Sequence, residues 1–361
     1  MIPVNGYLEL FDKGYGFLRS IDDNLRPSPE DPFVPAQLIN KWNMAEGALI
    51  HGAGAKGTGK NRNLKLATIE TVNGLSLERH REVRSLQEQI SIDPSSQLRM
   101  SQGPDDLMGR ALDWIVPIGR GQRGLVVSPP KTGKTTILKH MASSILTHYP
   151  DTQVFVLLVD ERPEEVTDFK RSLENARVLH SSADQDLIQH MRITRFTMNI
   201  AIRYAEVGQD AVVFIDSLTR MARAFNADTR SHGRTMSGGL AAGALEIPRR
   251  IFGAARNIED GGSLTVIATI LVETGSRMDD IIFQEFKGTG NMDLMLSRKC
   301  AEQRVWPAIN INDSGTRKEH LLLSESEYKE VADARRWLSQ RDEVSAMTSL
   351  LEFFDAHRQE S

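Results

Sequence analysis

The chain has 361 residues, enough for two or three domains with cores of their own. Its 40% hydrophobic and 25% charged residues are typical of a globular protein, and its formal net charge of −4 excludes a globally basic nucleic-acid binder. The single cysteine, Cys300, excludes internal disulfides and a cysteine-based zinc site. Residues 1–6 lack the pattern of a secretory leader and no run of 18 apolar residues occurs, so we expect a cytoplasmic enzyme with no membrane partner.

Short strands separated by turn residues dominate the first 75 residues. Residues 6–10, 14–20, 32–34 and 63–72 have strand-like patterns, and Gly, Asp and Pro divide them. The string from Lys13 to Arg19 nearly matches the signature of the RNA recognition motif, but that fold needs a strand and a helix before the signature. Because little chain precedes Lys13, we expect an all-β barrel of the OB or cold-shock type over residues 1–75.

An aromatic strand in this region indicates binding of single-stranded RNA. Tyr15 and Phe17 are two residues apart, so both rings lie on one face of a strand, and the flanking glycines leave room for a base. Stacking on such rings contributes roughly 1–3 kcal/mol per base. The alternative is that both rings fill the barrel core. The predicted RNA-binding residues are Gly14, Tyr15, Gly16, Phe17, Leu18 and Arg19, with Arg19 and Lys13 as phosphate cations, Asp31 as an acceptor for a base amine, and Phe33 as a third ring.

Residues 76–117 form the predicted connector between two domains. Residues 77–90 are rich in Glu, Arg and Gln and have helical potential, which the Asp93-Pro94 pair ends. A stretch with two arginines among three glycines follows the connector, and it could contact a nucleotide. The alternative is that it forms a basic turn on the surface. The candidate nucleotide contacts in it are Gly119, Arg120, Gly121, Gln122, Arg123 and Gly124.

A phosphate-binding loop is predicted at residues 128–136, which we call the phosphate loop. Apolar residues lead up to it, and a helix is expected to follow as far as Met141. Backbone N–H groups at a helix N-terminus bind phosphate, a Lys adds charge, and a Thr hydroxyl can hold Mg²⁺. Ser128 stands where the strict eight-residue pattern has Gly, so an ordinary strand–turn–helix is the alternative. The candidate ATP contacts here are Lys131, Thr132, Gly133, Lys134, Thr135 and Thr136.

Near-continuous apolar runs with helical patterns between them predict a parallel sheet. They cover residues 124–127, 154–159, 178–179, 211–215 and 264–271. Glu161 and Asp216 follow two of these runs, at strand ends where sites of such sheets form. We expect Asp216 to hold Mg²⁺, partly through water, and Glu161 to orient or deprotonate the attacking water. The alternative is that both acids only cap strands or helices.

Taken together, these motifs resemble the family of transcription termination factor Rho, which is a hexameric, RNA-dependent helicase–translocase of the RecA/F1 ATPase class. The similarity rests on residues 13–20, 118–136, 160–166, 216–226, 252–257 and 286–309, and it covers nearly the whole chain in the right order. It implies a barrel over residues 1–75, a connector over 76–117 and a RecA-type ATPase domain over 118–361 that ends in helices over 324–340 and 343–356.

The resemblance also implies roles for individual residues. Lys134 and Thr135 would contact phosphate and Mg²⁺, Glu161 would be the catalytic base, and Asp216 would be the metal-side acid. Arg162 would contact phosphate, and Trp306 would stack on adenine unless it only fills a core. Arg317 matches the position of an arginine finger that a neighbouring subunit supplies, and Arg304 and Lys287 match supporting positions. A guanidinium supplied in this way contributes on the order of 10³-fold or more to the rate in related hydrolases.

Two further loops would face RNA in the central hole of the ring. They contain Met236, Ser237, Gly238 and Gly239 in the first and Arg277 in the second. In the barrel, this family has a Tyr on a hairpin where this chain has Asn61, Arg62 and Asn63, with Arg62 as the candidate contact. A preference for pyrimidine-rich RNA therefore rests on the resemblance alone.

The sequence thus predicts an ATP- and Mg²⁺-dependent homohexamer that translocates RNA and terminates transcription by dissociating the transcription complex, with RNA polymerase as a partner. Another RecA/F1-class ring ATPase, whose barrel serves only assembly, is the alternative among enzymes. An RNA-binding adaptor that keeps ATP as a structural ligand is the alternative from another class. The aromatic strand and Arg277 disfavour the first alternative, and Glu161, Asp216 and Arg317 disfavour the second.

Overall fold

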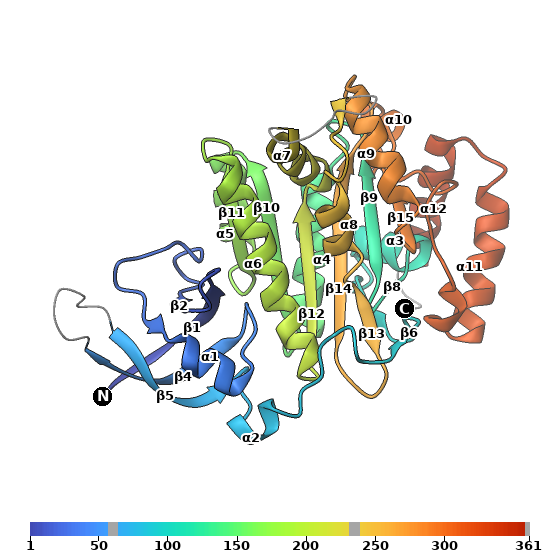
Figure 1. Ribbon diagram of the computed structural model, residues 1–361. Helices are drawn as coiled ribbons and strands as arrows, with labels where there is room; N and C mark the ends of the chain where they lie inside the picture. Colours follow the sequence, from blue (N-terminus) through green and yellow to red (C-terminus); the bar gives the residue numbers. More distant parts are fainter. Residues whose placement is uncertain (57–63, 231–238, 358–361) are drawn as a thin grey trace.

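Figure 1 shows the computed structural model of the chain, which describes residues 1–56, 64–230 and 239–357. The first part is a closed barrel with the strand order β1-β2-β3-β5-β4, which confirms the predicted all-β barrel. Its core contains Leu8, Leu18, Val34, Ile50 and Leu66. The barrel elements are β1 (Ile2–Leu10), β2 (Gly16–Arg19), β3 (Phe33–Val34), α1 (Ala36–Trp42), β4 (Leu49–Lys56) and β5 (Leu64–Val72).

The larger part is built on one sheet, to which nine strands contribute among the described residues. Six of them run parallel, which confirms the predicted architecture. In spatial order the main strands are β11 (Arg177–Ser182), β10 (Gln153–Glu161), β12 (Asp210–Asp216), β14 (Ser263–Leu271), β9 (Arg123–Ser128), β15 (Met292–Met295) and β16 (Gly315–Thr316). Strands β13 (Arg256–Ile258) and β6 (Ser91–Ile92) extend the sheet beside β14.

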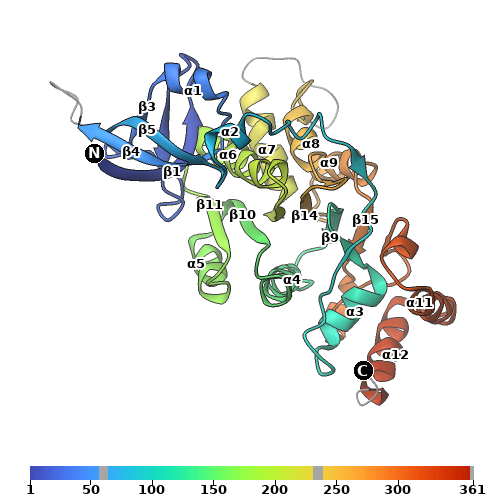
Figure 2. The same ribbon diagram turned by 90° about the horizontal axis from the view of Figure 1, so that it is seen from below.

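Helices cover both faces of this sheet, so β12 and β14 are buried along almost their whole length. Figure 2 shows the two layers. One contains α6 (Leu187–Glu206), α7 (Leu218–Arg230), α8 (Glu246–Phe252) and α9 (Arg277–Lys287), and the other contains α3 (Leu107–Ile115), α4 (Lys134–His148) and α5 (Pro163–Ser172). None of the helices in the described ranges combines the length and the apolar character that crossing a bilayer requires.

The connector contains less helix than its composition predicts. The expected helix over 77–90 is wrong beyond α2 (Leu77–His80). The reason is that Leu86 is fully buried and donates its backbone N–H to the carboxylate of Glu206 on α6, at 2.8 Å, rather than to a helical carbonyl. Tertiary burial therefore overrides local propensity here. The rest of the connector pairs β7 (Gln97–Leu98) with β8 (Ile118–Gly119).

The two predicted C-terminal helices are confirmed as α11 (Glu325–Leu338) and α12 (Glu343–Ala356). Ser324 and Glu327 form a capping box that starts α11, and Asp342 caps α12 through two backbone N–H groups. The buried residues Met347, Leu350 and Phe354 of α12 join the core on the α3 side of the sheet. Two short helices, α10 (Arg298–Glu302) and the 3₁₀ turn η2 (Glu319–Leu321), precede this pair.

The barrel is fixed to the edge of the sheet by side chains from both parts. The hydroxyls of Tyr7 and Tyr204 are 2.8 Å apart. The side-chain amide of Asn24 pairs with both the backbone C=O and N–H of His180 on β11, at 2.8 and 2.9 Å. Arg192 of α6 binds the carboxylate of Glu9 with two nitrogens, at 2.5 and 2.9 Å. The barrel and the sheet are therefore joined by partly buried polar contacts beside apolar packing of Leu25.

Candidate functional site

The phosphate loop joins the carboxyl end of β9 to α4. Its turn uses positive φ angles at Lys131 (65°) and Gly133 (83°), and Gly133 caps α4. Ser128 is buried, and its hydroxyl lies 3.0 Å from that of Thr132, which donates to the Pro129 carbonyl at 2.8 Å. These bonds hold the loop without the Gly of the strict pattern. The first N–H groups of α4 have no helical acceptor and can bind a phosphate.

Lys134 is the first residue of α4, and its ammonium lies 2.5 Å from a carboxylate oxygen of Asp216. Asp216 ends β12 and is fully buried. The same oxygen accepts a hydrogen bond of 2.9 Å from Thr269, whereas the other oxygen accepts none from any described residue. A buried carboxylate with a free oxygen beside the phosphate loop suits a cation that accompanies a triphosphate. The predicted meeting of loop and acid is therefore present in the structure.

Glu161 ends β10, the strand next to β12, and is fully buried too. Burial, followed by the negative charge of Asp216, raises the pKa of Glu161. One carboxylate oxygen accepts from the Arg162 N–H and lies 3.1 Å from the Arg220 guanidinium, and the other accepts no hydrogen bond from a described residue. A carboxylate with a raised pKa and a free oxygen can accept a proton from water.

Arg220 was missed in the sequence reasoning. It lies on α7, four residues after Asp216, and binds Glu161 and the backbone carbonyl of Asp160. Its position four residues after Asp216, at the start of the helix that follows this acid, was the signal in the sequence that could have identified it. Arg162, by contrast, is exposed at the start of α5, directly after Glu161.

An aromatic ring covers the phosphate loop. A Cβ placed on Gly133 would lie 3.0 Å from the indole of Trp306, so only Gly fits beneath this ring. Trp306 keeps 41% of its surface exposed, which disfavours a purely core role. The exposed Arg304 lies two residues earlier, after α10. The structure thus brings Trp306 to the loop of its own subunit.

The stretch from Gly119 to Gly124 lies at the other end of β9. Strand β9 has six residues, and its length of roughly 20 Å separates most of this stretch from the phosphate loop. Arg120 pairs with Asp210 at the start of β12, and Gln122 is buried and donates to Asn291 at 2.7 Å. Gly121, at φ 86°, packs on the backbone of Asn257. The structure does not bring these residues to the predicted nucleotide site, because their groups stabilise the amino ends of the strands.

Arg317 and Lys287 also lie at the amino ends of the strands. Arg317 follows β16, and its N–H donates to the carbonyl of Asn291, just before β15. Lys287 ends α9, and both side chains are exposed. The pairing of Met295 with Val127 shows that the opposite end of β15 is the one nearest the phosphate loop. Arg317 therefore cannot reach the nucleotide of its own subunit.

Four aromatic rings form a cluster on the barrel, which we call the aromatic cluster: Phe11, Tyr15, Phe17 and Phe33. Phe11, which the sequence reasoning missed, is 39% exposed and stacks on Tyr15 with centroids 5.4 Å apart and planes 8° apart. Tyr15, Phe17 and Phe33 are partly exposed, so the cluster is not the barrel core. Its surface can stack with bases.

Two residues of the predicted barrel site have a different environment from the one expected. Leu18 is 1% exposed and belongs to the barrel core. Arg19 is 3% exposed, lies 2.5 Å from Glu9 and also pairs with Asp31. Its charge is therefore used within the protein, and the expectation that it neutralises an RNA phosphate is not met. Asp31 is bound by Arg19 and accepts the N–H of Ser28 at 2.7 Å.

The described parts of the two predicted RNA loops lie side by side. A Cβ on Gly239 would lie 3.5 Å from the side chain of Met278, which follows Arg277 on α9. Arg277 is exposed, and the next turn is anchored by the buried Asp279, which binds Arg223 and accepts from Thr274 at 2.6 Å. The candidates Arg62, Met236, Ser237 and Gly238 lie outside the described residues.

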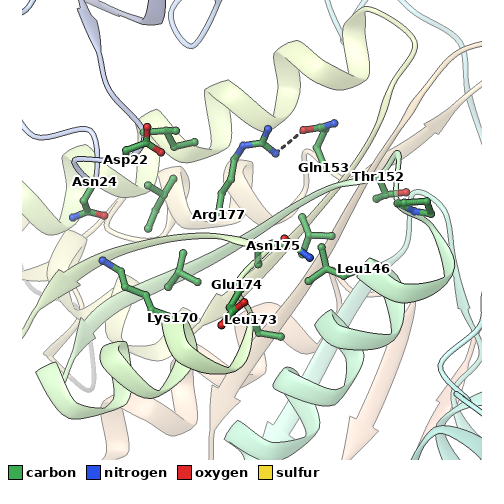
Figure 3. Close-up of a pocket in the computed structure, with 16 residues that line it drawn as sticks. Asp22, Asn24, Leu146, Thr152, Gln153, Lys170, Leu173, Glu174, Asn175 and Arg177 are labelled. Carbon is green, nitrogen blue, oxygen red and sulfur yellow. Dashed lines mark hydrogen bonds between the residues drawn. The ribbon is translucent and has the colours of Figure 1, made fainter.

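A further cavity lies elsewhere in the described part of the chain. It has a volume of about 740 Å³ and is bounded by the barrel loop around Asp22, the edge strand β11 and the end of α5. Figure 3 shows Lys170 and Arg177 among its lining residues, with Arg177 donating to Gln153 at 2.5 Å. Asp22 and Glu174 balance these charges. The cavity is separate from the phosphate loop and contributes no residue to the candidate site.

Comparisons with known proteins agree with this geometry. Residues 4–78 match the Rho termination factor RNA-binding domain, and residues 109–316 match the nucleotide-binding domain of the ATP synthase alpha/beta family. Proteins named transcription termination factor Rho are 45% identical in Haemophilus influenzae, covering 96% of this chain and 83% of the relative, and 43% identical in Aquifex aeolicus, covering 98% and 81%. A Thermotoga maritima protein of that name is 43% identical, covering 96% and 81%.

Solved structures support the fold. A prototypical ATPase from the type III secretion system of pathogenic bacteria aligns with a TM-score of 0.60 at 22% identity, covering 69% of this chain and 70% of that one. An assembled type III secretion ATPase from enteropathogenic E. coli also has a TM-score of 0.60, at 21% identity, with 76% and 63% covered.

Proposed function

Because this chain belongs to the family of transcription termination factor Rho, we propose that it is an RNA-stimulated ATPase that moves along nascent single-stranded RNA and ends transcription by dissociating the transcription complex. The observation that carries the proposal is the meeting of Lys134, Asp216 and Glu161 at the carboxyl ends of neighbouring strands, in a chain that also has an RNA-binding barrel. RNA polymerase is the proposed partner, and the cytoplasm is the proposed location.

In the proposed reaction, Lys134 and the first N–H groups of α4 hold the phosphates of ATP, with Lys131 to Thr136 around them. Glu161 accepts a proton from the attacking water through its free oxygen. Arg162, exposed beside Glu161, contacts phosphate. Arg220 holds Glu161 in place from α7.

The residues present fit Mg²⁺. Asp216 is buried with one oxygen free, and Thr135 lies in the first turn of α4. We propose that these two residues hold the ion, partly through water. When bound, Mg²⁺ neutralises charge on the β- and γ-phosphates. Trp306 would stack on the adenine. Arg304, two residues earlier, stays a candidate for a supporting cation from the sequence.

The site is completed by a second subunit. Arg317 and Lys287 lie at the amino ends of the strands, away from the phosphate loop of their own chain, which supports a role at a nucleotide held by a neighbour. A guanidinium there neutralises charge that develops on the transferred phosphoryl group. Such sites require a ring, and we propose a homohexamer.

RNA binding is assigned to two regions. We propose that residues 1–75 are the primary RNA-binding domain, 76–117 the connector and 118–361 the ATPase domain. The aromatic cluster, with Gly14, Gly16 and Asp31 around it, would stack bases of pyrimidine-rich RNA. Gly239 and Arg277 would contact the strand that is pulled through the ring. Arg62 and residues 236–238 stay candidates from the sequence.

ATP turnover, measured with and without a C-rich RNA on protein of known assembly mass, tests the proposal. We expect a hexameric mass and turnover that rises at least about tenfold with RNA. A ring ATPase without an RNA role would hydrolyse ATP equally fast in both conditions. An adaptor that binds ATP only as a structural ligand would show no turnover in either.

A further inference from the structure

An acidic side chain lies at the sheet edge where the two cations meet. Asp293 is in β15, and its register partner in β16 is Gly315. Arg317 is two residues beyond Gly315 and pairs with Asn291 through its N–H. Residues two apart in a strand lie on the same face, so Arg317 and Asp293 are diagonal neighbours on one face of the ladder.

This face is the one that α9 covers. Met292 and Leu294 belong to the core on the α3 side, so Asp293 points to the other side, where Phe286 of α9 is buried. Lys287 follows Phe286 and ends the helix. A Cβ on Gly315 would meet nothing within 4 Å, so no side chain of β16 separates Asp293 from the two cations.

The side chain of Asp293 is half-buried. One carboxylate oxygen is buried and accepts no hydrogen bond from any described residue. Burial raises the pKa of Asp293, and the charges of Arg317 and Lys287 act in the opposite direction. Other buried carboxylates of this chain, such as Asp113 and Asp279, accept hydrogen bonds that hold the fold together. The charges that act on the carboxylate of Asp293 are those of Arg317 and Lys287, whose side chains are exposed.

We propose that Asp293 is the positioning residue for the trans-acting cations: its carboxylate holds Arg317 and Lys287 together in the orientation in which they meet the nucleotide of the neighbouring subunit. This inference rests on the proposed function, because it assumes that Arg317 acts in trans. Two cations at one edge repel each other, and a carboxylate between them offsets this repulsion. It also limits the rotamers of two long side chains before a nucleotide arrives.

Asp293→Asn tests the inference, because it keeps the shape of the side chain and removes its charge. We expect kcat of the RNA-stimulated ATPase to fall roughly tenfold or more, with the KM for ATP within about twofold, because a misplaced catalytic group costs rate and spares binding. Asp293→Glu should recover part of the loss. The matched control is Asp333→Asn on α11, which removes an exposed carboxylate paired with Arg336 and should leave kcat unchanged.

Mixed rings separate a role in trans from a role in cis. Asp293→Asn subunits have an intact Glu161, and Glu161→Gln subunits have intact cations, so a mixture contains complete sites. We expect the mixture to turn over faster than either variant alone. In a background that carries both Arg317→Ala and Lys287→Ala, Asp293→Asn should change kcat by less than about twofold, because both of its targets are gone.

The kinetic results and the mixed-ring results separate the role of Asp293 from the shared site. A normal kcat for Asp293→Asn, or an additive loss in the background that lacks both Arg317 and Lys287, would overturn the role of Asp293 and leave the shared site standing. The role of Asp293 is also overturned if Glu161→Gln subunits rescue the turnover of Arg317→Ala subunits but do not rescue that of Asp293→Asn subunits. If Arg317→Ala is not rescued either, the shared site is refuted and the inference falls with it.

Discussion

At the scale of single residues, the burial of Glu161 disfavours its charged form and therefore lowers the stability of the fold at neutral pH. A carboxyl whose pKa is raised by the fold disfavours folding above that pKa and stops doing so as the pH falls through it. Glu161→Gln should therefore raise the Tm at neutral pH while it lowers turnover by at least about 100-fold and leaves ATP binding intact. Thermal melts and nucleotide titrations check both effects, and a lower Tm or lost ATP binding would contradict this account.

Trp306 permits a second prediction at this scale. Its indole lies against Gly133, and the proposed adenine stack predicts that Trp306→Ala raises the KM for ATP about threefold to tenfold. Trp306→Phe keeps a ring and should stay within about twofold of the unchanged protein. The measurement is steady-state turnover against ATP concentration with saturating RNA. An unaltered KM for Trp306→Ala would assign the ring to packing alone.

At the scale of elements, the aromatic cluster on the barrel should act as a unit. Tyr15→Ala combined with Phe17→Ala removes two stacking rings, and RNA affinity should fall by at least about thirtyfold. ATP affinity should not change, because the cluster and the phosphate loop lie on different parts of the molecule. Titration of a labelled C-rich RNA gives the affinity. Tyr328→Ala, an exposed aromatic on α11, is the control, and equal RNA affinities would show that the rings only pack together.

Elements with a strong local pattern could be predicted from the sequence, and contacts between distant segments could not. The apolar runs before Glu161 and Asp216 gave the parallel strands, because strands buried on both faces need such runs. The predicted helix over 77–90 is cut short by the burial of Leu86 against α6. The stretch from Gly119 to Gly124 has the composition of an anion site, yet it leads into strand β9 and so lies at the opposite end of that strand from the phosphate loop.

The same limit applies to charges in the candidate site. Arg19 lies in an aromatic, glycine-rich strand that indicates RNA contact, but Glu9 and Asp31 use its charge inside the barrel. Arg220 belongs to its candidate site through Glu161, which lies 59 residues earlier in the chain. Phe11 belongs to the aromatic cluster through Tyr15, which lies 4 residues later. A side chain's environment, rather than its type, decided each of these cases.

At the scale of the whole molecule, the two ends of the sheet lead to the proposed ring. The phosphate loop lies at the carboxyl ends of the strands, and Arg317 and Lys287 lie at the amino ends, so in the proposed ring one subunit would carry halves of two different sites. The barrel is fixed to the same sheet through Tyr7, Asn24 and Arg192. Movement of one ATPase domain against the next would therefore carry the attached RNA-binding barrel with it.

The most direct test of this account mixes two inactive variants. Glu161→Gln subunits lack the base and keep the cations, whereas Arg317→Ala subunits lack the finger and keep the base. With C-rich RNA present, we predict that each variant alone turns over ATP at least about 100-fold more slowly than the unchanged protein. Mixed rings should recover turnover well above either variant alone. A mixture no more active than its components, measured on assemblies of confirmed mass, would contradict a site shared between neighbouring subunits.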